Sequence, residues 1–267
     1  MKDFDVGDEN RTGAAIDLQV FVESDSAGIA ERAAAYIAGL GRNAIVEKGF
    51  FTLALSGGHT PLTLFRLLAS PKWQKHLGWG LSEWARTRVF WADERCVAPE
   101  HPESNFGNAD RVLFGSLGHG ETEFLFRMHG EAEPEAAAIA YAHQLCEYVP
   151  ARLNGIPRFD CILLGMGEDG HTASLFPGSD LSPKGALVAV ARAGHLGDRP
   201  ESRRLTLTLP VLNAAACCLF LVSGSAKQKP LKAALNLLAR PVLPVQHVRP
   251  VNGKLLWIVD RDACSAD

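Results

Sequence analysis

The sequence predicts an α/β fold in which a mostly parallel sheet carries helices on both faces. Short apolar runs alternate along the chain with longer segments of helical pattern. Parallel strands need such helical crossovers between them, and the helices then cover both faces of the sheet. We expect residues 16–267 to form a single α/β domain, preceded by a flexible leader at residues 1–15.

The expected strands share apolar runs rich in β-branched or aromatic residues. They fall at residues 17–23, 50–55, 88–92, 159–164, 187–191, 205–209, 217–222 and 255–259. Helices are predicted where capping residues, prolines and helical spacing coincide. They run from a cap at Ser24 or Asp25 to about residue 40, onward from Pro61, and over residues 105–114, 134–149 and 226–238.

Composition narrows the functional class. The chain has 267 residues, of which 47% are apolar and 21% charged, with a net charge of −3. These values favour a globular protein with a substantial core and argue against nucleic acid as a partner. No apolar run is long enough to span a membrane. Residues 1–10 lack the apolar core of a secretory signal, so we expect a cytoplasmic protein, and by default a monomer.

The six cysteines show no metal-site spacing and no compact disulfide pattern. Cys161, Cys217 and Cys218 lie inside apolar runs. We interpret them as small buried hydrophobic residues.

A glycine-rich turn, Ser56-Gly57-Gly58, follows the second predicted strand. Glycines let a ligand approach the backbone closely, and the amides at the start of the next helix favour an anion. Thr60 is expected to cap that helix, with Pro61 at its first position. The Gly-Lys-Ser/Thr ending of a Walker loop is missing. A phosphate cradle and a simple strand-to-helix turn both remain open.

Three consecutive charges, Asp93, Glu94 and Arg95, follow the third predicted strand. Charges are costly when buried without a partner, so these must pair, face water or face a ligand. An arginine here can bind an oxyanion or hold a carboxylate in place. An ion-paired loop is the alternative interpretation, and Ser104-Asn105 fits a cap for the next helix.

Residues 165–170 follow the strand at 159–164 and match the dinucleotide pattern G-x-G-x-x-G. That pattern needs a full helix directly after it, and Pro177 stops any helix within about two turns. The better interpretation is a loop that presents Asp169 and His171 at the sheet edge. Histidine changes charge near neutral pH, and a carboxylate can orient it, so this pair is a candidate for acid–base catalysis.

Two basic positions in the second half complete the candidates. Arg204 precedes the strand at 205–209, and Lys227 lies at the start of the helix predicted at 226–238. A lysine in the first turn of a helix opposes the helix dipole, which makes sense if an anion sits there. An exposed lysine without a function is the alternative.

Five segments of the chain resemble 6-phosphogluconolactonases: LALSGGHTPLTLF, WADERCVAPEHPESNFGNA, ILLGMGEDGHTASLFPG, RRLTLTLPVLNAA and LVSGSAKQ. They occur in the family's order and spacing from about residue 17 to residue 260. The resemblance implies the Rossmann-like α/β sheet shared with glucosamine-6-phosphate deaminases. It also implies hydrolysis of 6-phospho-D-glucono-1,5-lactone to 6-phospho-D-gluconate, the second step of the oxidative pentose phosphate pathway, with no cofactor and no metal.

The resemblance further implies roles for the candidate residues. His171 would be the general base, oriented by Asp169 or another nearby carboxylate, and Asp93 and Arg95 match the family's Asp-Glu-Arg active-site residues. The phosphate-binding residues would be Ser56, Gly57, Gly58, Thr60, Arg204 and Lys227.

Three departures and two alternatives accompany this resemblance. Cys96 and Ala98 replace the bulkier apolar residue and the proline often seen in that loop of the family. His59 stands where many family members have serine. A deaminase of the same superfamily would carry a glutamate where this chain has Phe176. A non-catalytic sugar-phosphate-binding regulator would need the phosphate site but neither Asp169 nor His171, so their presence argues against it.

Overall fold

A parallel sheet forms the centre of the molecule. The computed structural model describes residues 17–118, 124–194, 203–236 and 238–264, so the leader predicted at 1–15 lies outside the described residues. Within these ranges, one sheet has six strands in the order β1-β11-β10-β7-β2-β3, all paired in parallel. Its strands are β1 (Asp17–Glu23), β2 (Phe51–Leu55), β3 (Thr87–Trp91), β7 (Cys161–Leu164), β10 (Cys217–Val222) and β11 (Lys254–Asp260).

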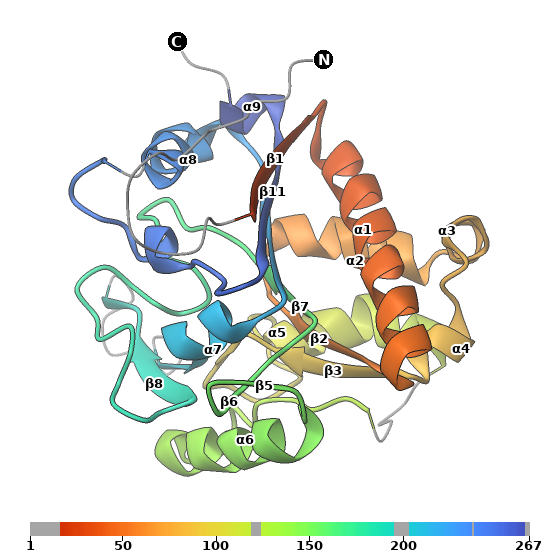
Figure 1. Ribbon diagram of the computed structural model, residues 1–267, viewed down its shortest axis with the longest axis horizontal. Helices are drawn as coiled ribbons and strands as arrows, with labels where there is room; N and C mark the ends of the chain where they lie inside the picture. Colours follow the sequence, from red (N-terminus) through yellow and green to blue (C-terminus); the bar gives the residue numbers. More distant parts are fainter. Residues whose placement is uncertain (1–16, 119–123, 195–202, 237, 265–267) are drawn as a thin grey trace.

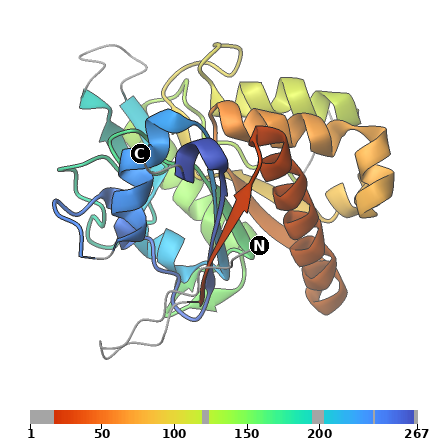
Figure 2. The same ribbon diagram turned by 90° about the horizontal axis from the view of Figure 1, so that it is seen from above.

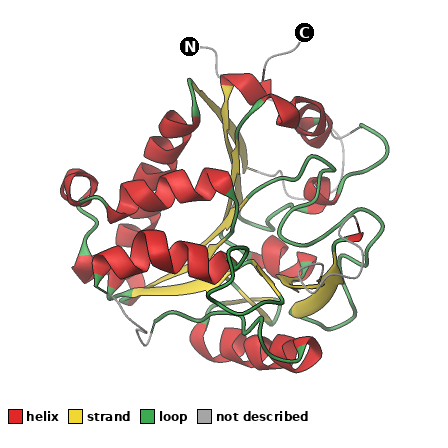
Figure 3. Ribbon diagram, turned by 180° about the vertical axis from the view of Figure 1, so that it is seen from behind, coloured by secondary structure: helices red, strands yellow, loops and turns green. Residues whose placement is uncertain are grey.

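Helices cover both faces of this sheet, as predicted (Figure 1). One face carries α1 (Ser26–Lys48), α2 (His59–Ala69), α3 (Pro71–Leu77), α4 (Leu81–Trp84) and α5 (Asn105–Ala109), which a π-helical turn (Asp110–Phe114) continues. The other carries α6 (Pro134–Tyr148), α7 (Leu209–Ala214) and α8 (Gln228–Leu235). The short helix α9 (Arg261–Cys264) follows β11. Figure 2 shows the two groups on opposite sides, and Figure 3 shows the strands running between them.

The alternation of side chains along each central strand produces two separate cores. In β10, Leu219 belongs to the core under α1 and α2, whereas Phe220 belongs to the core under α6 to α8. The strand therefore reads as a continuous apolar run, because both of its faces are buried. Cys161, Cys217 and Cys218 are buried in these cores, which confirms their interpretation as hydrophobic residues. No helix in the described ranges is long and apolar enough to cross a membrane.

A second, antiparallel sheet lies beside the central one. It consists of β4 (Asp93–Arg95), β9 (Arg203–Leu207) and β8 (Val188–Arg192). The strands predicted at 187–191 and 205–209 thus lie outside the parallel sheet. No helix is predicted between them, and a connection without a helix favours antiparallel pairing, because the long crossover between parallel strands is usually a helix. A small ribbon of β5 (Arg152–Leu153) and β6 (Ile156–Pro157) precedes β7.

Helix α1 extends to Lys48, a little over two turns beyond the predicted end near residue 40. Asp25 caps its start by accepting a hydrogen bond from Gly28 N at 2.9 Å, as expected, and Gly49 ends it in the left-handed conformation. Gly41 lies inside the helix because a Cβ there would meet the Trp79 ring at 2.1 Å. This glycine reflects close packing rather than a helix end.

The packing of Gly41 against Trp79 yields a stability prediction. Gly41→Ala should lower the free energy of unfolding by about 1–3 kcal/mol, because the added methyl overpacks a buried ring. Gly39→Ala is the control: no described atom lies within 4 Å of its Cβ position, so it should be neutral or stabilise by up to about 1 kcal/mol. Urea denaturation of both variants measures the difference, and equal values would contradict the packing argument.

Candidate active site

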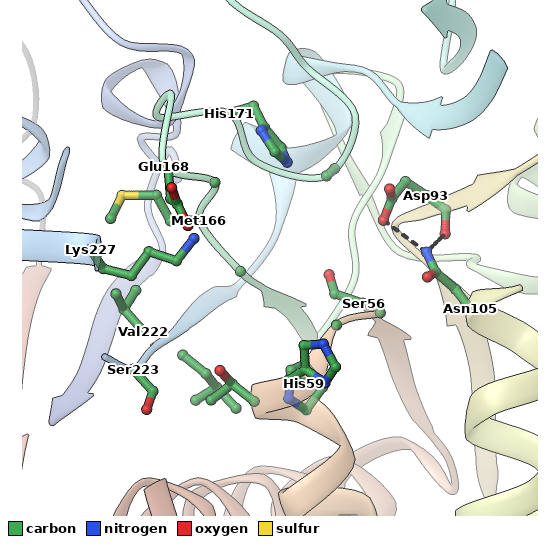
Figure 4. A pocket seen from close by; sticks show the side chains of 18 of the residues that line it. Ser56, His59, Asp93, Asn105, Met166, Glu168, His171, Val222, Ser223 and Lys227 are labelled. Atoms are coloured by element: carbon green, nitrogen blue, oxygen red, sulfur yellow. Dashed lines mark hydrogen bonds between the residues drawn. The ribbon is translucent and has the colours of Figure 1, made fainter. Parts of the chain in front are cut away.

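A polar pocket lies at the carboxyl ends of the central strands. Its cavity volume is about 460 Å³, a size suited to a small molecule. The residues that line it come from the turns after β2, β7 and β10 and from β4 and its neighbourhood (Figure 4). Of the predicted site residues, the pocket brings together Ser56, Gly57, Gly58, Thr60, Asp93, Arg95, His171 and Lys227.

The glycine turn after β2 forms one wall of the pocket. Gly58 has φ +102°, which glycine adopts readily, and a Cβ on Gly57 would lie 1.8 Å from Asn105 Oδ1. Both glycines are therefore required by geometry. The buried Ser56 hydroxyl donates to Leu163 O at 2.7 Å, so it ties β2 to β7 and can offer only its lone pairs to other groups.

The start of helix α2 differs from the prediction. The helix begins at His59, with Gly58 as its N-cap, so Thr60 is not the cap and Pro61 is the third helical residue. No side-chain hydrogen bond caps this helix in the described part of the chain. The reason is that Gly58 can adopt the required backbone angles, so the helix starts earlier than a Thr60 cap would allow. Its first amides remain available to an anion.

The loop after β7 holds the predicted histidine–aspartate pair. His171 Nδ1 lies 2.6 Å from Asp169 Oδ1, and the same oxygen accepts from the His171 amide at 3.1 Å. When Nδ1 carries the proton of the neutral imidazole and donates it in the hydrogen bond to Asp169, Nε2 carries none and can accept a proton. Partial burial raises the pKa of Asp169, but hydrogen bonds and attraction from His171 outweigh it, so the pKa lies below its ordinary value. Asp169 itself is not among the pocket-lining residues.

The backbone of this loop is shaped to hold the imidazole. The Gly167 amide donates to His171 O at 2.8 Å, and a Cβ on Gly167 would lie 2.1 Å from His171 Nδ1. Gly170 has φ +78°. No α-helix follows within the described residues 171–194, which confirms the rejection of a dinucleotide-binding fingerprint. Phe176, at the position where a deaminase would have its glutamate, packs on His171 with ring centroids 4.8 Å apart.

Asp93 and Glu94 are both buried, but Asp93 lines the pocket and Glu94 does not. Asp93 Oδ2 accepts from Ser174 Oγ at 2.7 Å, and Asn105 Nδ2 donates to Asp93 O at 2.9 Å. Glu94 accepts from the Ser104 hydroxyl and from the amides of Arg95, Asn105 and Phe106 at 2.7–3.0 Å.

The carboxylate of Glu94 is thus a clamp between β4 and the start of α5, outside the pocket lining. Burial raises its pKa, and the hydrogen bonds from the Phe106, Asn105 and Arg95 amides and the Ser104 hydroxyl oppose that rise. The two carboxylates accept from neutral donors and Arg95 donates to a backbone carbonyl, so the ion-paired-loop interpretation is wrong for Glu94.

The predicted basic residues occupy two different places. Lys227 ends the 3₁₀ turn Ser225–Lys227 and points into the pocket near Glu168 and Met166 (Figure 4). Arg95 lines the pocket and donates to Glu103 O. Arg204 pairs with Arg95 across the β4–β9 register and is absent from the pocket lining. Burial and the neighbouring Arg95 lower the pKa of Arg204.

Several lining residues were not predicted from the sequence: Asn105, Met166, Glu168, Val222 and Ser223. Asn105 was expected only to cap α5, and Ser104 does that by accepting from Gly107 N at 3.0 Å. Asn105 instead points to Asp93 and fills the space beside Gly57. A polar side chain next to the cap was the available signal. Within the described ranges, no group of three or more His, Cys, Asp or Glu side chains is arranged to hold a metal ion.

Taken together, the fold and the pocket define a class: an α/β protein with a histidine–aspartate pair, the start of a helix and a lysine at the carboxyl ends of its parallel strands. Residues 24–257 match the profile described as glucosamine-6-phosphate isomerases/6-phosphogluconolactonase. The chain belongs to this family.

Individual relatives agree with the profile. A 6-phosphogluconolactonase from Synechocystis is 36% identical over 82% of this chain and 86% of its own length. A probable 6-phosphogluconolactonase from Arabidopsis thaliana is 35% identical over 86% of both chains. Among solved structures, the 6-phosphogluconolactonase from Trypanosoma cruzi superposes with a TM-score of 0.81 at 25% identity, covering 95% of this chain and 98% of its own.

The clamp formed by Glu94 yields a second stability prediction. Glu94→Gln should lower the free energy of unfolding by about 1.5–3 kcal/mol. The substitution replaces one acceptor oxygen by an NH₂ group, which would face the donors that this oxygen now accepts from and leave them unsatisfied. Glu100→Gln, on the exposed part of the same loop, is the matched control and should change it by less than about 0.5 kcal/mol. Urea denaturation of both variants measures this, and an unchanged midpoint for Glu94→Gln would show that the clamp adds nothing.

Proposed function

We propose that this chain hydrolyses 6-phospho-D-glucono-1,5-lactone to 6-phospho-D-gluconate, the second step of the oxidative pentose phosphate pathway. The observation that carries the proposal is the His171–Asp169 pair at 2.6 Å, beside a pocket whose other wall has free helix amides and Lys227. Hydrolysis of this lactone needs a general base that takes a proton from water and a site that binds the phosphate group at the other end of the substrate. The similarity to named 6-phosphogluconolactonases supports the same reaction.

In this mechanism, His171 Nε2 takes a proton from water as the water oxygen bonds to the lactone carbonyl carbon. The bond from that carbon to the ring oxygen then breaks, and the imidazolium returns its proton to the leaving oxygen. Arg95 or backbone amides of the glycine loop stabilise the oxyanion that forms in between. Asp169 holds the tautomer that makes Nε2 the base.

Phosphate binding serves orientation in this proposal. The amides at the start of α2 and the ammonium group of Lys227 hold the phosphate, so that binding energy aligns the carbonyl carbon with His171. Asp93, held by Ser174 and Asn105, is left to face the sugar. Arg204, beside Arg95 in the antiparallel pair, lies outside the pocket lining, and its expected contact with the phosphate stays a prediction.

Phe176 favours the lactonase over a deaminase. Its apolar ring lies against His171 where amine chemistry would need an acid–base group. An assay that couples 6-phosphogluconate formation to a dehydrogenase, run beside a deaminase assay, tests the choice. Hydrolysis no faster than the spontaneous decay of the lactone would refute the proposal. The cytoplasmic location, the monomeric state, the single domain at 16–267 and the absence of a cofactor stay predictions.

The separate roles of His171 as the base and Lys227 as a phosphate-binding residue can be tested kinetically. His171→Ala should lower kcat by about 10²–10⁴-fold with little change in KM, because it removes the base. Lys227→Ala should mainly raise KM, whereas Lys229→Ala, on the exposed side of the same segment, should change neither constant. Steady-state rates measure this, and near-normal turnover in the His171 variant would refute the assigned base.

Orientation of the histidine can be tested separately. Asp169→Asn should lower kcat by at least about tenfold, because an amide no longer selects the tautomer with a free Nε2. Asp180→Asn is the control, since Asp180 makes a similar local contact, accepting from Ser182 N at 2.9 Å, in an exposed loop. Equal kcat values for the two variants would leave Asp169 without a catalytic part.

A further inference from the structure

The segment that places Lys227 starts where β10 ends. Ser223 and Lys227 both line the pocket, and Gly224 between them has φ +95°, a conformation that only glycine adopts without strain (Figure 4). The Lys227 amide donates to Gly224 O at 3.0 Å, so the position of the lysine follows the position of this turn. What holds Gly224 therefore decides where the ammonium group lies.

Asp260 holds this turn from the neighbouring strand. It is the last residue of β11, which lies beside β10 with Val222 opposite Val259. Its carboxylate accepts from the Ser223 hydroxyl, from Gly224 N at 3.0 and 3.1 Å, and from Ala263 N at 2.9 Å. The side chain is only 3% exposed. One carboxylate thus joins the turn before Lys227 to the first turn of α9.

A second contact fixes the other end of the same segment. Gln228 Nε2 donates to Asp262 O at 2.8 Å, directly after Lys227. The residues on either side of the lysine are therefore both fastened to the corner between β11 and α9. Neither Asp260 nor Asp262 lines the pocket, so they can position a ligand there only through the segment 223–228.

Electrostatics distinguishes a positional role of Asp260 from a direct contribution to anion affinity. A buried negative charge near an anion-binding lysine disfavours anion binding, so it is not explained as a direct contribution to affinity. Asp260 must therefore act by fixing the conformation of the turn, because its carboxylate accepts hydrogen bonds from donors at the strand end that would otherwise be unsatisfied. Removing the charge while keeping the shape then has two opposed consequences for an anion: weaker repulsion and a displaced lysine.

We propose that Asp260 is a positioning residue for the phosphate group of the substrate, acting through the Ser223-Gly224 turn to place Lys227. The proposal rests on the function proposed above, in which Lys227 binds that phosphate. It extends the site to the end of β11, a strand that contributes no pocket-lining residue.

The test compares Asp260→Asn with a matched variant at the opposite ends of the parallel strands. Asp260→Asn should raise KM for the phosphorylated lactone and the dissociation constant of inorganic phosphate about tenfold each, the change expected when one charge-assisted contact is displaced. kcat, and kcat/KM for unphosphorylated D-glucono-1,5-lactone, should stay within about twofold. A general loss of structure would lower these as well.

Asp160→Asn is the matched control. Asp160 directly precedes β7, at the amino ends of the strands, and accepts from Thr52 N and Thr52 Oγ1 at 2.8 Å each and from Lys48 Nζ at 2.6 Å. It therefore resembles Asp260 in its contacts but lies away from the pocket. KM and phosphate affinity should be unchanged in this variant, even where its melting temperature falls.

A second variant keeps the proposal testable should Asp260→Asn fail to fold. Gln228→Ala removes the other attachment at a half-buried position and should weaken phosphate binding by about threefold. Gln74→Ala is its control, because Gln74 in α3 also donates to backbone carbonyls, those of Leu68 and Ala69 at the end of α2, at 3.2 Å each.

The outcomes separate this proposal from the proposed function. Phosphate affinity that is equal in Asp260→Asn and Asp160→Asn, or a uniform fall in kcat for both lactones, would overturn the positioning role. A wild-type chain that binds inorganic phosphate without hydrolysing the lactone would refute the proposed function. In that case a tenfold loss of phosphate affinity in Asp260→Asn would still support the positioning role. A wild-type chain that binds no phosphate would overturn it.

Discussion

The candidate site depends on the parallel pairing of β2, β7 and β10. Because these strands run in the same direction, the turns that follow them meet at one edge of the sheet. Ser56, His171 and Lys227 are far apart in sequence and come together only through this pairing. The strands themselves are buried on both faces, so their register is set by two apolar cores rather than by the polar residues at their ends.

The polar edge of the sheet is organised by buried groups that each join two elements. Ser56 joins β2 to β7, Glu94 joins β4 to α5, and Asp260 joins the end of β10 to α9. Donors that are satisfied in this way hold their loops before any ligand arrives. Two of these three groups, Glu94 and Asp260, lie outside the pocket lining.

The candidate site was predicted in part, and the errors have physical causes. The His171–Asp169 pair follows from local sequence, because two residues separated by one position in a glycine loop can meet without help from the fold. The Thr60 cap was wrong, because Gly58 allows the helix to begin earlier. Arg204 lies opposite Arg95 in the antiparallel pairing of β4 with β9 and outside the pocket lining, so its expected contact with the phosphate stays a prediction.

Sequence alone determined the six strands of the parallel sheet, the longer helices, the family resemblance and the residue types that carry chemistry, since these depend on local periodicity and short motifs. The short strands β4, β5 and β6 were not predicted. Only the tertiary structure decided that β8 and β9 form an antiparallel sheet with β4, and that Asn105 packs against Gly57. It alone showed that Asp260 fastens the turn before Lys227. Such contacts join residues that lie tens to more than a hundred positions apart in the chain. No local pattern encodes them, because they exist only once the sheet has brought its strand ends together.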